Sequence, residues 1–472
     1  MVARRSLIAG MLLASTACVE SVAPRGPSVH LKLATGGEQR GLAGTVLPER
    51  IGVWLLDDEG MPVEGATIRW SSPTPGARFD PETSVSGYTG LATTTWRLGI
   101  GGDTQVAVAR PDGWDDAFEI TATVDAAFKA KSLMRGEWTA HMCALDSSGK
   151  AYCWGYGHQG QLGGGPSTLA FVPAPVPVAG DHRFVELRGA QFTTCGRTLE
   201  GQLWCWGGRG SVLGTGSTAG STVPVRAVPE LSVADFDVAD GYICAVTFDG
   251  AAYCWGTGFL GDGQNRRTSL TPQRVAGPTQ WRRIGVETVN ACAVALDYRV
   301  YCWGEVFDNY RELGIPQSGQ LRVPTLASVV PPLYDISMGR NQCGIGPMSA
   351  VCWGQWYNGV TWGQGPGPEF PRLGGYPVQL VETANFTLLA LSVTGHLWFW
   401  GQPVDGGWSL SPEPVQVGPP VPWLDMAVGG GDAYSILRAD STVYRWTRFT
   451  SGYPSYSTNG FVVSAVLPTA AP

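Results

Sequence analysis

The sequence predicts an all-β protein, with a seven-bladed β-propeller preceded by an immunoglobulin-like β-sandwich. Three observations lead to this fold class. A hairpin that ends in Trp-Gly recurs along the chain from residue 143, and a run of short β-rich segments precedes it. The composition, with 65 Gly, 34 Pro and 15% charged residues among 472, is typical of many short strands joined by turns.

Residues 1–17 are predicted to be a secretory signal peptide. Arg4 and Arg5 form a positive region, an apolar core runs from Leu7 to Ala14, and small residues follow. This is the order of segments in an export signal, and the apolar stretch is too short to span a bilayer. Residues 18–27 then form a short tether.

Cys18 is the predicted lipidation site. The small residues before it resemble a bacterial lipobox, although Ser15 stands where Leu is usual. Ordinary cleavage that leaves Cys18 as a free thiol is the alternative. Lipidation implies a protein exported to the bacterial cell envelope or cell surface and held at the membrane only through a lipid at Cys18.

Residues 28–125 are predicted to form the sandwich, because about seven short strands in about 100 residues are typical of an immunoglobulin-like fold. The runs DDEGMPVEGATIRW and SGYTGLATTTWRLG resemble the bacterial immunoglobulin-like repeats of invasin-type surface proteins. This segment has no cysteine pair, so we expect Trp70 and Trp96 to hold the two sheets together. The resemblance implies a spacer or adhesion module.

Seven copies of the hairpin motif follow. The first, CALDSSGKAYCWG, ends in Trp154-Gly155, and the marker tryptophans lie 46 to 52 residues apart. A fixed period of this length indicates a repeat fold. The marker tryptophans are Trp154, Trp206, Trp255, Trp303, Trp353, Trp400 and Trp446.

Each repeat supplies about four strands, so residues 128–472 predict a seven-bladed propeller. An approach strand comes before the hairpin, and an outer segment such as VPVRAV or YPVQLV comes after it. The last segment, FVVSAV at Phe461–Val466, has no repeat after it. We expect it to pair with the first blade and close the ring.

Ten of the 11 cysteines are predicted to form five disulfides, each across one hairpin. Two cysteines that face each other on paired strands have a Cα separation that a disulfide accepts, and export supplies the oxidising environment. Zinc would need two pairs to meet, and the pairs belong to different repeats. In the sixth copy Leu389 and Phe399 replace the pair, and in the seventh Ser435 and Arg445 do. The five pairs are Cys143 with Cys153, Cys195 with Cys205, Cys244 with Cys254, Cys292 with Cys302, and Cys343 with Cys352.

The first repeat resembles the regulator of chromosome condensation repeat. GHQGQLGGG, at residues 157–165, follows the first Trp-Gly, and Leu213-Gly214, Leu260-Gly261 and Leu313-Gly314 are remnants of its Gln-Leu-Gly. The resemblance covers about residues 128–472 and implies a propeller. It implies little about function, because propellers carry unrelated activities.

No catalytic or cofactor motif stands out, so we expect a non-enzymatic protein without metal or cofactor. The five histidines are dispersed, and the formal charge of −7 without a basic stripe argues against nucleic acid. We expect a monomer that binds an unknown protein or glycan through the loops after Trp-Gly, where aromatic residues gather. The predicted binding residues are Phe307, Tyr310, Trp356, Tyr357 and Trp362.

Two other functions stay open. A carbohydrate-active enzyme could pair two loop carboxylates across a pocket, and a purely structural envelope component needs neither. The loop acids considered for the enzyme are Asp262, Asp308, Glu312 and Asp405.

Overall fold

The computed structural model describes most of residues 28–466. The residues within that range that it leaves out are 42, 45, 100–101, 125–127, 137–138, 140, 167–169, 266, 278–279, 289, 307–312, 340, 347–349, 355, 358–361, 364–365, 371–376, 385–386, 402–410, 418–420, 430–431, 439–440 and 448–461. The predicted signal peptide, the tether and Cys18 therefore lie outside the described residues. Among the residues that are described, no helix is long and apolar enough to cross a bilayer.

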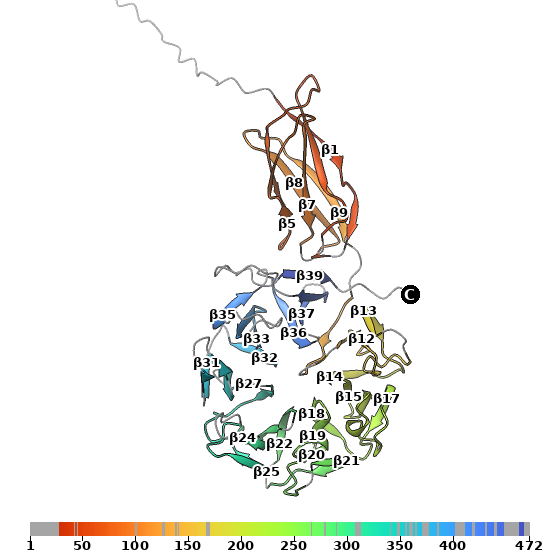
Figure 1. Cartoon of the computed structure of the whole chain (residues 1–472), viewed down its shortest axis with the longest axis vertical. Coiled ribbons are helices and arrows are strands. Elements are labelled where there is room, and N and C mark those ends of the chain that lie inside the picture. The colour runs from red at the N-terminus through yellow and green to blue at the C-terminus, as the bar shows by residue number, and fades with distance from the viewer. Residues whose placement is uncertain are drawn as a thin grey trace, which may run out of the picture.

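The first part of the chain folds into two sheets around one core (Figure 1). Trp70 and Trp96 come from different sheets and are both buried in that core, as the sequence predicts, and Phe79 stacks on Trp96. One sheet has the order β1 (His30–Thr35), β3 (Ile51–Leu56), β7 (Leu91–Arg97), β5 (Arg78–Asp80). The other has the order β2 (Gln39–Gly41), β9 (Phe118–Val124), β8 (Thr104–Pro111), β4 (Thr67–Ser71), β6 (Thr83–Val85).

Apart from the two-stranded sheet of β29 (Trp356–Tyr357) and β30 (Trp362–Gly363), the strands of the rest of the described chain form four-stranded antiparallel sheets around a common centre, the arrangement of a β-propeller (Figure 1). We number them sheets 1 to 7 in chain order. Sheets 1 to 3 are β10 (Ser132–Leu133), β11 (His141–Leu145), β12 (Ala151–Tyr156), β13 (Phe171–Pro177); β14 (Phe184–Ala190), β15 (Thr193–Thr198), β16 (Leu203–Gly207), β17 (Ser221–Ala227); and β18 (Val233–Ala239), β19 (Tyr242–Thr247), β20 (Ala252–Thr257), β21 (Thr268–Arg274).

Sheets 4 to 7 repeat this order. They are β22 (Trp281–Glu287), β23 (Asn290–Ala295), β24 (Val300–Val306), β25 (Gly319–Leu326); β26 (Asp335–Ser337), β27 (Asn341–Ile345), β28 (Ala350–Gly354), β31 (Pro366–Phe370); β32 (Val378–Ala384), β33 (Thr387–Ser392), β34 (Leu397–Gly401), β35 (Ser411–Val417); and β36 (Trp423–Gly429), β37 (Asp432–Leu437), β38 (Val443–Thr447), β39 (Val462–Val466). A short 3-10 helix, η1 (Gly210–Val212), follows β16.

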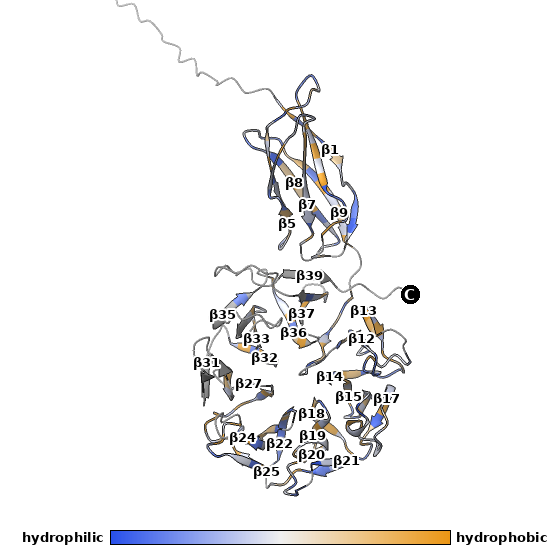
Figure 2. Cartoon of the chain, viewed as in Figure 1, coloured by the Kyte–Doolittle hydropathy of each residue, from blue (hydrophilic) through white to orange (hydrophobic). Residues whose placement is uncertain are grey.

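The strands of each sheet lie in chain order from the centre outward. The first strand of a sheet contacts the first strand of the next, as β18 contacts β22, and the hairpin strands in the middle of the sheets are almost wholly buried. The outer strands β17 and β21 carry hydrophilic residues at the rim (Figure 2). Each sheet therefore buries its hairpin between two neighbours.

The predicted ring closure is wrong. The segment FVVSAV contains β39, which pairs with β38 and completes sheet 7 rather than the first sheet. The ring is closed by residues 128–130, because Ala130 N–H donates to Ser441 O at 2.7 Å and Val443 N–H donates to Phe128 O at 3.3 Å. A last strand can extend its own sheet or the first one with equal hydrogen bonding, and the sequence pattern does not distinguish the two edges.

A second correction concerns the seventh hairpin. Arg445 faces Tyr434, not Ser435, so Tyr434 occupies the position of the first cysteine. This hairpin has one residue more between the two positions than the first four have, and counting ten residues back from Arg445 selects the wrong residue.

Candidate functional site

Two of the five predicted binding residues lie outside the described structure, and only the backbone of the other three is described. Phe307 and Tyr310 lie outside the described residues. Trp356 and Tyr357 form β29, which pairs with β30 (Trp362–Gly363), so that Tyr357 faces Trp362 in register. The role of all five residues in binding stays a prediction.

The five cysteine pairs form disulfides as the spacing predicts. Each joins two residues that face each other on neighbouring strands, with Cα atoms 4.0 to 4.1 Å apart. All ten side chains are buried, so these cysteines belong to the scaffold and not to a reactive surface. The disulfides join Cys143 to Cys153, Cys195 to Cys205, Cys244 to Cys254, Cys292 to Cys302, and Cys343 to Cys352.

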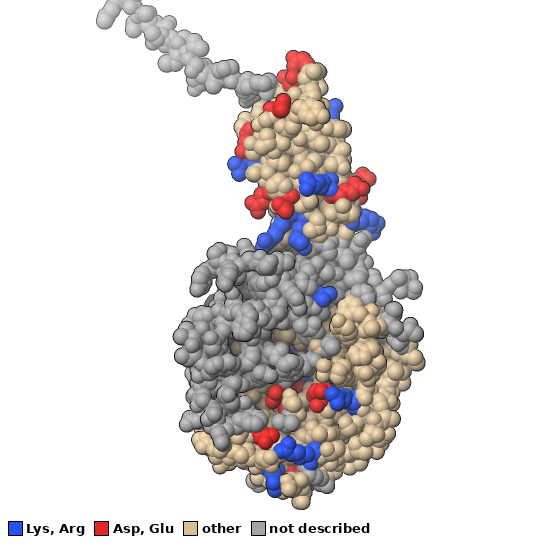
Figure 3. Space-filling model, viewed as in Figure 1, with Lys and Arg blue, Asp and Glu red and all other residues tan. Residues whose placement is uncertain are grey.

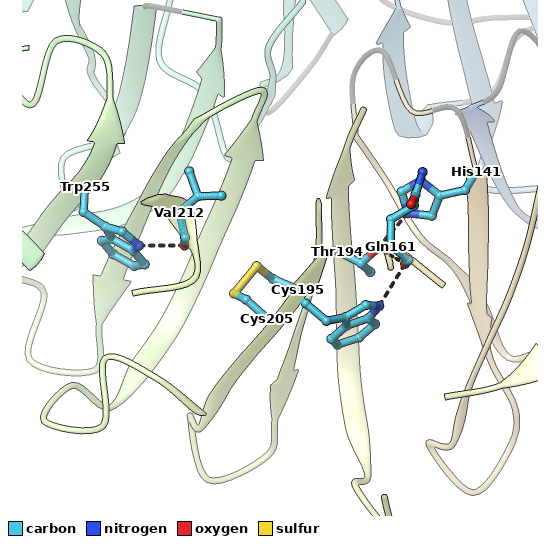
Figure 4. The surroundings of a disulfide bond; sticks show 8 residues. His141, Gln161, Thr194, Cys195, Cys205, Val212 and Trp255 are labelled. Atoms are coloured by element: carbon cyan, nitrogen blue, oxygen red, sulfur yellow. Dashed lines mark hydrogen bonds between the residues drawn. A yellow bond between two sulfur atoms is a disulfide. The ribbon is translucent and has the colours of Figure 1, made fainter. Parts of the chain in front are cut away.

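Marker tryptophans bind the loop of the preceding sheet. In sheets 2, 3 and 4 the indole Nε1–H donates to a carbonyl oxygen of that loop, and the acceptor directly precedes a Leu-Gly pair. Figure 4 shows the contacts of sheets 2 and 3. The three bonds run from Trp206 to Gln161, from Trp255 to Val212 and from Trp303 to Phe259, each 2.9 Å long.

The glycine of each Leu-Gly pair makes room for the next tryptophan. Gly163, Gly214 and Gly261 all have positive φ, and a Cβ at any of them would lie within 3.3 Å of the indole nitrogen. Leu162-Gly163, Leu213-Gly214 and Leu260-Gly261 thus mark docking points between neighbouring sheets.

The hairpin turns make a second contact between sheets. The carbonyl of one turn residue accepts the N–H at the start of the next sheet, and the turn residue has positive φ so that its carbonyl points to the neighbour. Four of the six described turn residues are glycine, as expected for this backbone conformation. The contacts are Gly149 with Phe184, Gly201 with Val233, Gly250 with Trp281, Tyr298 with Leu333, Gly395 with Trp423 and Ser441 with Ala130, at 2.7 to 2.9 Å.

Exposed apolar side chains lie at or beside these turns in sheets 2 to 5. We call this set the turn arc; its members are Leu199, Phe248, Leu296, Tyr298 and Tyr334, each between 37% and 73% exposed. Gln280 connects the turns of sheets 3 and 4, because its amide donates to Asp249 O at 3.3 Å and its carbonyl accepts Leu296 N–H at 3.0 Å. Phe248 also lies beside Gly201 of the sheet 2 turn, and Tyr334 meets Tyr298 edge-on, so contacts link the turns of sheets 2 to 5.

The turn arc and the starts of the loops after Trp-Gly lie at opposite ends of the hairpin strands. In an antiparallel hairpin the turn is at one end of the two strands, and the chain leaves the second strand at the other end. The loops after Trp-Gly begin at that other end. The two ends of the hairpins are thus separate candidates for binding.

Charged side chains gather where the innermost strands meet, and acidic and basic residues cluster there in Figure 3. Every sheet contributes at least one member of this central charge network. The ion pairs are Arg135 with Glu382 (3.3 Å) and Asp425 (3.7 Å), Arg188 with Glu186 (2.9 Å) and Asp237 (4.0 Å), Arg197 with Glu186 (3.2 Å), and Arg283 with Asp235 (3.6 Å) and Asp335 (3.5 Å).

Three carboxylates of the network also bind the backbone of the next sheet. Asp235 accepts Ile284 N–H at 2.7 Å, Asp237 accepts Val286 N–H at 2.9 Å, and Asp425 accepts Leu133 N–H at 2.9 Å. An innermost strand lacks a strand partner on its central side, and an unpaired buried N–H is costly. These carboxylates supply the missing acceptor.

Burial perturbs the acids of the network. It raises the pKa of Asp235 and of Glu382 to about 7 each, although arginines nearby oppose the shift. For Glu186 the nearby arginines outweigh burial. Burial favours the protonated form, yet Arg188, Arg197 and Arg135 together hold its pKa below the usual value. The centre of the ring thus contains two carboxyl groups that titrate near neutral pH.

The described residues show no metal centre. No three His, Cys, Asp or Glu side chains among them lie close enough to hold a metal ion. His141 is buried against Thr194, and burial lowers its pKa to about 3. Of the loop acids, Asp262 accepts Gln264 N–H at 2.9 Å in its own loop, while Asp308, Glu312 and Asp405 lie outside the described residues.

Sequence reasoning missed both the turn arc and the central charge network. A signal for the network was present, since Glu186 and Arg188, like Asp235 and Asp237, alternate on an approach strand. On a strand, residues two apart point to the same side. For the turn arc the signal was the apolar residue directly after the second strand of a sheet, as at Leu199, Phe248 and Leu296.

Comparisons with known proteins support a regulator of chromosome condensation-type propeller. The family model described as "Regulator of chromosome condensation (RCC1) repeat" matches residues 139–161. The ultraviolet-B receptor UVR8 of Arabidopsis thaliana is 33% identical over 141 residues, which are 29% of this chain and 32% of the receptor. The chain thus spans about a third of that relative.

Solved structures agree on the fold. Human WBSCR16 is similar with a TM-score of 0.57 and 16% identity, over 79% of this chain and 100% of the other. Prp20p of Saccharomyces cerevisiae is similar with a TM-score of 0.57 and 17% identity, over 69% of this chain and 87% of the other. At such low identity the likeness concerns the fold alone.

Proposed function

We propose that this chain is a non-enzymatic binding protein whose propeller binds a protein partner. The observation that carries the proposal is the turn arc. Its large apolar side chains are exposed on turns that backbone hydrogen bonds fix to the next sheet. Large apolar residues exposed near one another on a rigid support are typical of protein interfaces.

The partner is a protein rather than a glycan because of the chemistry of the arc. Leu199 and Leu296 are aliphatic, and they offer no ring face on which a sugar could stack. Phe248 and the two tyrosines add the aromatic area that interfaces favour. A carbohydrate-active enzyme that uses loop carboxylates is the alternative function.

The remaining parts of the proposal concern the rest of the chain. We infer that the ring is a seven-bladed propeller and that the N-terminal sandwich is immunoglobulin-like and acts as a spacer. Residues 1–17 direct export, Cys18 carries a lipid, and the protein acts as a monomer at the cell envelope or surface. The supporting features are the export-type order of segments at the N-terminus and the five disulfides, which form in oxidising compartments.

Similar propellers bind proteins, which supports the class of partner. The structure of Prp20p was described with its binding to Gsp1p and histones, and a further structure shows yeast RCC1 (Prp20) with Kap60. We do not transfer these partners, because an exported protein would not meet them. What is transferred is the use of this fold as a protein-binding surface.

The test is capture of a partner followed by titration of the two candidate regions. The full chain is immobilised and exposed to solubilised envelope proteins, and the captured protein is purified and titrated against two variants. We expect L199S/F248S/L296S to weaken binding at least tenfold, which would place the interface on the turn arc. A loss of binding confined to W356A/W362A would place the interface on the loops after Trp-Gly instead. Capture of nothing beyond what a bare support retains would contradict a protein partner.

A further inference from the structure

Tyr298 occupies a turn position that is glycine in four other sheets and Ser441 in sheet 7. Its φ is +68°, in the left-handed region that side chains with a Cβ adopt with strain. The turn still makes its contact with the next sheet, since Tyr298 O accepts Leu333 N–H at 2.8 Å. A glycine would make the same bond without strain, so the tyrosine ring is not needed for the junction. Strain of this kind is concentrated at functional positions.

The Tyr298 ring is the middle of a cluster of three side chains. The guanidinium carbon of Arg282 lies 5.0 Å from the ring centroid, and the ring of Tyr334 meets it edge-on at 5.1 Å. Arg282 comes from β22, Tyr298 from the turn after β23, and Tyr334 from the segment before β26. Both tyrosines are more than a third exposed, so the cluster faces solvent and is not part of a core.

Arg282 has no carboxylate partner among the described residues, in contrast to its neighbours. Arg283 pairs with Asp235 and Asp335 in the central charge network, and Arg299 pairs with Asp297 at 3.8 Å. Arg282 instead lies over the face of Tyr298. A guanidinium stacked on a ring keeps its edge free for a planar bidentate partner such as a carboxylate.

We propose that Arg282, Tyr298 and Tyr334 form the anchor of the turn arc and bind a partner segment in which a carboxylate lies beside an apolar side chain. The carboxylate pairs with Arg282, and the apolar side chain packs on the tyrosines and Leu296. This inference rests on the proposed protein-binding function and specifies the chemistry of the partner.

The charge of Arg282 and the exposed rings beside it together favour an acidic and apolar partner segment. A basic segment would be repelled by Arg282. A wholly apolar segment would bury the guanidinium without a counter-ion, and a buried unpaired charge is costly. An acidic and apolar segment satisfies both the cation and the exposed rings.

The test uses two fluorescent twelve-residue peptides and the full chain. One peptide alternates Asp or Glu with Leu or Phe, and the other has Lys in place of every acid. We expect the acidic peptide to bind at least tenfold more tightly than the basic one, and R282Q and Y298G each to weaken it at least tenfold. The control is Y156A, since Tyr156 is also an exposed tyrosine beside an aromatic ring, Phe171 at 5.3 Å, but lies in sheet 1.

Y298G separates binding from folding. Glycine is the residue of four equivalent turns, so the Tm of Y298G should equal or exceed that of the parent while peptide binding is lost. A lower Tm with undiminished binding would mean that the ring only supports the turn, and equal affinity for the acidic and basic peptides would also overturn the proposal. If L199S/F248S/L296S lost the captured partner while Y298G and R282Q kept it, this inference would fail and the protein-binding function would stand.

Discussion

Trp255 shows how one side chain joins two sheets. Its indole is fully buried, and its N–H donates to Val212 O of the preceding sheet at 2.9 Å, beside Gly214, which has no Cβ to obstruct it. The same contact recurs at Trp206 and Trp303. Each of these tryptophans therefore contributes both apolar burial and a hydrogen bond between neighbouring sheets.

We predict that W255F destabilises the protein by about 2 to 4 kcal/mol. The substitution removes buried volume and leaves the carbonyl of Val212 without its donor, and both changes are costly. The measurement is urea unfolding followed by circular dichroism. The control, W54F in the sandwich, replaces an exposed tryptophan and should change stability by less than about 0.5 kcal/mol. Equal shifts in the two variants would show that the interblade hydrogen bond and the packing around Trp255 contribute little.

At the scale of the hairpin, the disulfides close loops between strands that are already paired. Cys195 faces Cys205 in register, and the pairs in the other four hairpins repeat this geometry. Sheet 6 has Leu389 facing Phe399 at these positions and forms the same four-stranded sheet. The disulfide is thus an addition to a hairpin that the backbone can form without it.

We predict that C195S/C205S folds and loses roughly 3 kcal/mol of stability, the chain-entropy value for a loop of about eleven residues. The measurement is urea unfolding of the oxidised parent and the variant. If the variant matched the parent, or if it failed to form sheet structure at all, this account of the hairpin would be wrong.

A thiol count tests all five disulfides at once. We expect none of the ten paired cysteines to react with a thiol reagent after denaturation without reductant, and all ten to react after reduction. Close to ten reactive thiols in the unreduced protein would contradict the disulfides.

At the scale of the whole molecule, the central charge network links the stability of the ring to pH. Glu382 faces Arg135, Arg188, Asp425 and Asp237, and its burial raises its pKa to about 7. In the unfolded chain a glutamate has a pKa of about 4.3. Between about pH 4 and pH 7 the folded protein therefore holds a proton that the unfolded chain releases.

We predict that stability falls as the pH rises from about 5 to 8, because the unfolded state binds fewer protons than the folded state in this window. E382Q removes one of the titrating groups and should flatten the dependence, with a Tm at pH 8 at least equal to that of the parent. The control is E230Q at an exposed position, which should leave the slope unchanged. A Tm that rises across this window, or a slope that E382Q does not alter, would contradict the role given to Glu382.

Local features of the molecule could be predicted from the sequence. The Trp-Gly period, the facing cysteines and the buried Trp70 and Trp96 all follow from patterns within single segments. The sequence pattern predicts neither the sheet that β39 joins nor the register of the seventh hairpin, because each depends on which of two nearby partners the chain meets in the folded ring. The side chains of the predicted binding residues are not described, so their role is still a prediction.

By itself the sequence determined the hairpins, their cysteine pairs and the number of repeats, because strand pairing across a short turn depends only on residues close together in the chain. Only the tertiary structure decided which carbonyl receives each tryptophan, which acids face Arg135 across the centre, and which turn residues join into one exposed arc. Those contacts connect residues about 30 to 290 positions apart, and they exist only once each sheet packs against the next and the last sheet meets the first.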